Sequence, residues 1–137
     1  FKTGIYYLAD VRRIRATPLG VEALVKQTAV RDGRGVAIRM EEEPGASGIN
    51  TIDNYARKVL AGYNFQGVRS TGSKLERARP VSSAAEAGNM NLLEGPWLGE
   101  LLDELEAFPL GGHDDQVDAL SGALAALGPG GEFKIWV

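Results

Sequence analysis

Short strand-like segments alternate with longer helix-like segments along most of this 137-residue chain. β-branched and aromatic residues are common in the former, whereas apolar residues recur three and four positions apart in the latter. Glycine and proline stand between many of these segments, where they favour turns. This alternation is typical of an α/β domain in which helices flank a sheet. At this length we expect one domain that buries about two-thirds of its unfolded surface.

The boundaries of the segments follow from the hydrophobic pattern and from the turn residues. We predict strands over residues 5–14, 36–41, 65–70 and 90–93. We predict helices over residues 18–31, 49–61, 73–79, 82–87, 96–107 and 113–127. Thr17 and Pro18 form a typical helix start, and Pro80 is expected to limit the helix that begins at Ser73. Residues 128–137 are expected to form a tail, loose or packed, after the last helix.

Composition excludes several classes of protein. The chain has no cysteine, which excludes disulfides and thiolate metal sites and agrees with a reducing cytoplasm. No apolar run approaches the roughly 18 residues that a membrane span needs. We therefore expect no membrane partner.

Charge is distributed unevenly although the net charge is only −3. Residues 1–79 contain 14 lysines and arginines against 8 acids, whereas residues 80–137 contain one lysine against 10 acids. A basic first part is suited to holding phosphates, and an acidic second part is suited to supplying metal ligands. The alternative is that the basic side chains only decorate exposed helix faces.

A cluster of acids stands at the start of the apolar helix predicted over residues 113–127. Asp114, Asp115 and Asp118 lie at its N-terminal end, where the helix dipole favours negative charge. Three acids this close repel one another unless a cation lies between them, and oxygen ligands suit Mg²⁺ or Mn²⁺. The alternative is that Asp114 is an ordinary N-cap and the others are first-turn acids.

A second acidic segment follows the strand predicted over residues 36–41. Glu41 is its last residue and Glu43 stands just past it, before Pro44 and Gly45 stop the strand. Chemistry in open α/β sheets is located at the carboxyl ends of strands. The alternative is an acidic loop exposed to solvent at the sheet edge.

No nucleotide-binding phosphate loop is present in the sequence. The nearest match runs from Gly67 to Gly72, but Lys74 comes one residue late and no Ser or Thr follows it. We therefore expect no ATP site in this chain.

Four stretches in order resemble the nuclease domain of the large terminase subunit of tailed bacteriophages or prophages. They are YYLADVRR at residues 6–13, MEEEPGASG at 40–48, STGSKLERA at 70–78, and FP at 108–109 followed by HDDQVDA at 113–119. The resemblance is to the C-terminal portion of that domain and implies an α/β, ribonuclease H-like fold with a mixed sheet flanked by helices. Members carry an earlier strand whose aspartate is a further metal ligand. Because no acid precedes Asp10, we expect the first strand to be lacking and residues 1–137 to be an N-terminally incomplete nuclease domain.

The resemblance implies a two-metal endonuclease that uses Mg²⁺ or Mn²⁺ to cut concatemeric viral DNA during genome packaging. Its implied catalytic residues are Glu41, Asp114 and Asp115. The implied metal ligands are these three residues and Asp118. The sequence does not decide whether Asp114 or Asp115 is the main ligand. Its implied partners are double-stranded DNA, the small terminase subunit and the portal protein, in the cytoplasm of the bacterial host.

Further residues are candidates for supporting roles. His113 is a candidate auxiliary ligand or a helix-start residue bonded to backbone, and Asp10 either lines the site or bonds to a neighbouring turn. Glu43 is a third auxiliary candidate. The candidate DNA-binding residues are Lys74, Arg77, Arg12 and Arg13.

Two other functions remain open. The first is a non-catalytic DNA-binding or packaging-assembly module of the same fold, which the lack of a first strand favours. The second is a different ribonuclease H-like enzyme, such as a Holliday-junction resolvase or a transposase, for which a preference for four-way junctions would be the sign.

Overall fold

The computed structural model describes residues 4–127 and 133–135. The described residues fall into two compact units, and each is a separate α/β arrangement. Unit 1 consists of residues 4–13 and 71–127, and unit 2 consists of residues 14–70 and 133–135. Each unit has its own parallel sheet and its own hydrophobic core.

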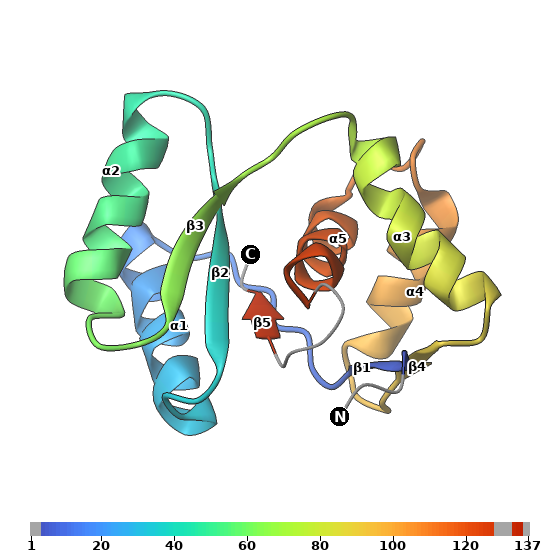
Figure 1. Ribbon diagram of the computed structural model, residues 1–137, viewed down its shortest axis with the longest axis horizontal. Helices are drawn as coiled ribbons and strands as arrows, with labels where there is room; N and C mark the ends of the chain where they lie inside the picture. The colour runs from blue at the N-terminus through green and yellow to red at the C-terminus, as the bar shows by residue number, and fades with distance from the viewer. Residues whose placement is uncertain (1–3, 128–132, 136–137) are drawn as a thin grey trace. The chain divides into compact units, whose positions relative to one another are not determined.

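Unit 2 is built on a three-stranded parallel sheet with the order β3-β2-β5 (Figure 1). Its strands are β2 (Ala37–Glu42), β3 (Phe65–Arg69) and β5 (Phe133–Ile135). Its helices are α1 (Pro18–Asp32) and α2 (Ala46–Asn54), the latter continued by the π-helical turn η1 (Tyr55–Val59). Val25 and Ala29 of α1 pack with Ile38 of β2 and with Tyr55 and Leu60, which holds both helices against the sheet.

Unit 1 combines a two-stranded parallel sheet with three helices. The strands are β1 (Tyr6–Leu8) and β4 (Met90–Leu92), and the helices are α3 (Lys74–Glu86), α4 (Leu98–Ala107) and α5 (Asp115–Leu127). Helix α5 lies beside α3 and α4 (Figure 1). Val81 of α3 and Leu120 and Leu124 of α5 form the core, against which Tyr6 and Met90 of the two strands pack.

Local signals predicted the first helix well. The hydroxyl of Thr17 accepts a hydrogen bond from the N–H of Gly20 at 3.2 Å, and Pro18 is the first helical residue. The helix ends at Asp32, and Gly33 follows with a φ of 87°. Both ends were predictable because each depends on residues within one helical turn.

The prediction that Pro80 limits a short helix is wrong. One helix, α3, runs through Pro80 from Lys74 to Glu86, where two helices were expected. Pro80 lacks the N–H that would bond to the carbonyl of Glu76. Ala78 and Val81, on either side of it, are buried, and their burial offsets that loss.

The strands also differ from the predictions. The first strand was predicted over residues 5–14 but covers only Tyr6–Leu8, because its partner β4 has three residues with which to pair. The predicted mixed sheet is not found among the described residues, where every strand pair is parallel. Within the expected tail, residues 133–135 form β5 and pair with β2, while residues 128–132 and 136–137 lie outside the described residues.

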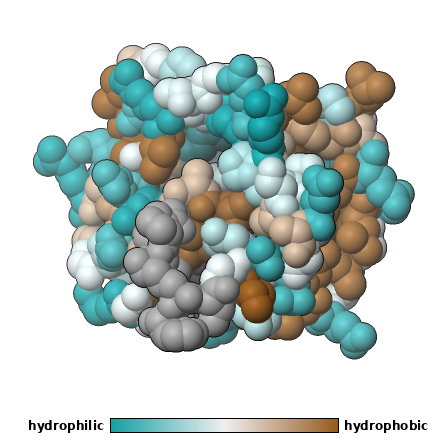
Figure 2. Space-filling view, turned by 45° about the vertical axis from the view of Figure 1, so that its right-hand side comes forward, coloured by the Kyte–Doolittle hydropathy of each residue, from teal (hydrophilic) through white to brown (hydrophobic). Residues whose placement is uncertain are grey.

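The surface mixes hydrophilic and hydrophobic side chains, as the face in Figure 2 shows. Leu19, Leu75 and Leu110 are among the large hydrophobic side chains that remain exposed. Single exposed apolar side chains are normal in globular proteins. Across residues 4–127 and 133–135, no helix has the length and apolar character needed to cross a bilayer.

Gly48 sets the distance between α2 and the loop that follows β2. It is buried in the first turns of α2, and a Cβ placed there would overlap the backbone carbonyl of Glu43. A larger residue would force the backbone of the helix and the loop apart. Gly48 therefore fixes the path of the chain directly after the acidic end of β2.

We predict that Gly48→Ala lowers the free energy of unfolding by about 1–3 kcal/mol, because the added methyl group meets backbone atoms that have no flexible side chain to yield. The measurement is a urea unfolding curve followed by circular dichroism. Gly35→Ala in the same unit is the control, since a Cβ at Gly35 meets no atom within 4 Å. Equal unfolding midpoints for the two variants would contradict the close approach at Gly48.

Candidate metal centre

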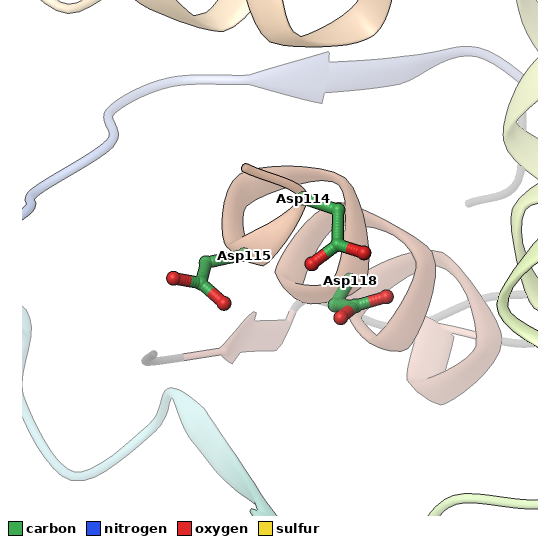
Figure 3. Close-up of side chains that lie close together, drawn as sticks. All are labelled: Asp114, Asp115 and Asp118. Atoms are coloured by element: carbon green, nitrogen blue, oxygen red, sulfur yellow. The ribbon is translucent and has the colours of Figure 1, made fainter. Parts of the chain in front are cut away.

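The start of α5 gathers three carboxylates. Asp115 is the first residue of the helix, Asp114 precedes it, and Asp118 follows one turn later (Figure 3). One oxygen from each carboxylate lies within 4.8 Å of the others. Asp114 and Asp118 are partly buried, whereas Asp115 is exposed. The structure thus brings together the three acids predicted for one end of this helix.

Lys74, the first residue of α3, is bonded to two of these acids. Its ammonium donates a hydrogen bond to Asp114 Oδ2 at 2.8 Å and lies 3.1 Å from Asp118 Oδ2. The hydrogen bonds to Asp114 and Asp118 raise the pKa of the Lys74 ammonium above its usual value. Lys74 therefore partly neutralises the cluster, and within the described residues Asp115 is the acid of the three that has no hydrogen bond or ion pair.

The other basic residues predicted to bind DNA also lie near acids of unit 1. The guanidinium of Arg77 donates to the carbonyl of Gly72 at 2.7 Å and lies 4.0 Å from Asp118. Arg12 pairs with Asp10 at 3.0 Å, and Arg13 lies 3.6 Å from Glu100. These side chains are partly neutralised in the structure, and their contact with phosphate stays a prediction.

Helix α4 contributes a buried acid that the sequence analysis missed. Glu104 is 7% exposed, and its Oε2 accepts a hydrogen bond from the N–H of Val117 at 2.7 Å. Its Oε1 accepts from Nε2 of Gln116 at 3.3 Å. The signal in the sequence was its spacing, because Glu104 lies three residues after the fully buried Leu101, on the apolar face of the helix.

The acidic end of β2 belongs to unit 2. Glu41 is the second-last residue of the strand, is exposed, and accepts a hydrogen bond from the hydroxyl of Ser70. Its neighbour Glu42 pairs with Arg69 of β3 at 2.7 Å, opposite it in the parallel register. Glu43 is exposed beyond the strand. The position of Glu41 at a strand end agrees with the prediction, and its sharing of an ion with Asp114 or Asp115 stays a prediction.

Two auxiliary candidates are placed simply. Asp10 follows β1, is exposed, and bonds to Arg12 two residues later. This contact is a local hydrogen bond, as in the alternative in which Asp10 bonds to a neighbouring turn and does not line the site. His113 is exposed and precedes Asp114 directly. The auxiliary roles of Asp10 and His113 at the metal centre stay predictions.

The chemistry of the donors at the start of α5 fits a hard divalent cation. Mg²⁺ and Mn²⁺ prefer carboxylate oxygens, and Mg²⁺ is commonly held by one or two carboxylates with water completing its shell. Asp114, Asp115 and Asp118 supply such oxygens from partly exposed positions that water reaches. A cation there would also relieve the repulsion between the three negative charges.

A family model described as "Terminase RNaseH-like domain" matches residues 2–127, which is most of the chain. No curated protein and no solved structure shows a significant match.

We predict that Lys74→Met changes metal-free stability and metal affinity in opposite directions. Without the ammonium, Asp114 and Asp118 repel each other more strongly, so the melting temperature in the presence of a chelator falls. Affinity for Mn²⁺ rises a few-fold, because the Lys74 ammonium no longer competes for the two carboxylates. The measurements are thermal unfolding followed by circular dichroism and titration with Mn²⁺ followed by electron paramagnetic resonance.

Arg79→Met is the matched control for this prediction. Arg79 is an exposed cation of the same helix, and its loss removes the same charge without touching the acidic cluster. Weaker Mn²⁺ binding by Lys74→Met than by Arg79→Met would show that Lys74 does not compete with the cation.

Proposed function

Because the chain belongs to the terminase ribonuclease H-like domain family, we propose that it is a metal-dependent endonuclease domain that cuts concatemeric viral DNA during genome packaging. The observation that carries the proposal is the grouping of Asp114, Asp115 and Asp118 at the start of α5. Such a grouping costs stability through charge repulsion. In a nuclease that uses divalent cations, the same carboxylates would hold the cations.

The proposed ligands are carboxylates that come from different elements. Asp115 and Asp114 at the start of α5 are the main candidates, and Asp118 is the auxiliary one. Glu41 at the end of β2 is proposed as a further ligand and catalytic residue, which rests on the resemblance and on its strand-end position. Asp115 is favoured over Asp114 because Asp115 is exposed and has no ion pair among the described residues, whereas Asp114 bonds to Lys74.

Two divalent cations, when bound, supply the activation of water and the stabilisation of the leaving oxygen in phosphodiester hydrolysis. In this proposal the acidic residues of the chain hold the cations, and its basic residues orient the DNA. Lys74 and Arg77 lie beside the acids and carry positive charge to the place where a DNA phosphate would approach them. Arg12 and Arg13 are proposed to make further phosphate contacts, which position DNA without selecting a base sequence.

The remaining proposals rest on the family. We propose that double-stranded DNA is the substrate and that the small terminase subunit and the portal protein are partners of the complete enzyme, in the cytoplasm of the bacterial host. The family match supports a packaging role in general terms.

We predict that Asp115→Asn reduces metal-induced stabilisation while leaving the fold intact or slightly more stable. The substitution removes one of three repelling charges and also removes a hard anionic ligand. A cation that binds only the native state at ten times its Kd stabilises that state by about 1.4 kcal/mol. Added Mg²⁺ should therefore raise the melting temperature of the wild type more than that of the variant.

Asp103→Asn, which changes an exposed aspartate of α4 in the same unit, is the control and should keep the wild-type metal response. Equal metal-induced shifts in the wild type and in Asp115→Asn would exclude Asp115 as a ligand, and Asp114 would take its place in the proposal.

Cleavage itself is tested by nicking of supercoiled plasmid in the presence of Mg²⁺ or Mn²⁺. We expect weak nicking by residues 1–137 that chelator stops and that both Glu41→Gln and Asp115→Asn remove, while Asp103→Asn retains it. A wild type that binds plasmid and divalent cation but cuts nothing would favour the non-catalytic DNA-binding module instead. Preferential binding of four-way junctions over linear duplex would favour a resolvase-like enzyme.

A further inference from the structure

The buried carboxylate of Glu104 is bonded to the start of the helix that carries the acidic cluster. Its two oxygens accept hydrogen bonds from the N–H of Val117 and from the side-chain amide of Gln116. Both partners are almost fully buried, with 2% and 4% of their surface exposed. A buried carboxylate is costly unless it is hydrogen-bonded, and here both oxygens are satisfied by one short segment of α5.

These contacts replace the usual capping arrangement of an α-helix. The carbonyl of Asp114 accepts the first helical hydrogen bond, from the N–H of Asp118 at 2.9 Å, so Asp114 stands at the N-cap position of α5. An N-cap aspartate ordinarily accepts a hydrogen bond from the second or third N–H of its helix. In α5 the third N–H, that of Val117, donates to Glu104, and the carboxylate of Asp114 bonds to Lys74.

Gln116 shows that the carboxylate dictates the local arrangement. Its Nε2 donates to Glu104, while its Oε1 is buried and has no hydrogen-bond partner among the described residues. The amide would gain nothing by turning over, since an ionised carboxylate accepts hydrogen bonds and donates none. Gln116 thus donates a hydrogen bond to Glu104 while its own oxygen stays buried without a donor among the described residues.

We propose that Glu104 is a positioning residue for the metal centre. By taking the N–H of Val117, it leaves the Asp114 carboxylate beside that of Asp118, where a cation binds both. A negative charge close to the N-terminal end of α5 is also favoured by the helix dipole. The proposal rests on the proposed metal-binding function and adds to it a residue that touches no substrate and no cation.

The main test compares two substitutions of Glu104. Glu104→Met fills the same space without an acceptor, so the Asp114 carboxylate turns to cap Val117. Glu104→Gln keeps an acceptor for Val117, and its amide donates to Gln116 once that side chain turns over. Loss of a residue that orients a metal ligand costs tenfold or more in affinity, so we expect Glu104→Met to bind Mn²⁺ about tenfold more weakly and Glu104→Gln to stay within about threefold of the wild type.

A purely structural role is separated by a destabilised control. Leu124→Ala removes buried volume from the core of the same unit without touching the start of α5. At a temperature where all variants are folded by circular dichroism, Leu124→Ala should bind Mn²⁺ like the wild type. Equal loss of affinity in Leu124→Ala and Glu104→Met would overturn the positioning role. Glu104→Ala, which leaves room for water, is the second acceptor-less variant if Glu104→Met does not fold.

A metal-free measurement tests the positioning directly. The carboxyl ¹³C signal of Asp114 and the amide ¹H signal of Val117 should both shift in Glu104→Met and return toward wild-type values in Glu104→Gln. An unchanged Asp114 signal in Glu104→Met would overturn the inference whether or not the chain binds metal. If Glu104→Met shows these shifts but the wild type binds no Mn²⁺, the proposed function is overturned instead.

Discussion

Electrostatic repulsion at the start of α5 is the constraint around which unit 1 is arranged. Asp114, Asp115 and Asp118 place three negative charges within 4.8 Å of one another, where charges interact strongly even at the surface of a protein. The helix dipole offsets part of the repulsion and the ammonium of Lys74 offsets more. The packing of α3 beside α5 brings that ammonium into place, and Val81 and Leu120 hold the two helices together.

The same helix end shows how a buried polar contact organises exposed ones. Glu104 pairs with the backbone of α5 from inside the unit, and Lys74 pairs with its acids from the outside. The single hydrogen of the Val117 N–H is donated to Glu104, while the carboxylate of Asp114 accepts a hydrogen bond from Lys74. The family match makes the chain a terminase ribonuclease H-like domain, and the acidic cluster supports the proposal that this domain binds divalent cations.

The sequence predicted the elements whose ends depend on neighbouring residues. The first helix begins at Pro18 after the Thr17 cap as expected, and β2 ends at its glutamates within one residue of the prediction. The α3 prediction was wrong because a rule about one proline takes no account of the burial of Ala78 and Val81. The strand at residues 133–135 was not predicted, because its partner β2 lies about 95 residues earlier and no local pattern announces such a pairing.

The sequence by itself determined the family, the α/β class and the two acidic segments, because these depend on residue types and on spacing along the chain. Tertiary structure alone decided that Lys74 bonds to Asp114 and Asp118, and that Glu104 is buried against Val117. The sequence indicated Lys74 only as a candidate phosphate contact, and the spacing of Glu104 after Leu101 placed it on an apolar helix face without indicating its partner. Their roles arise only when the packing of separate helices places donor and acceptor within about 3 Å of each other.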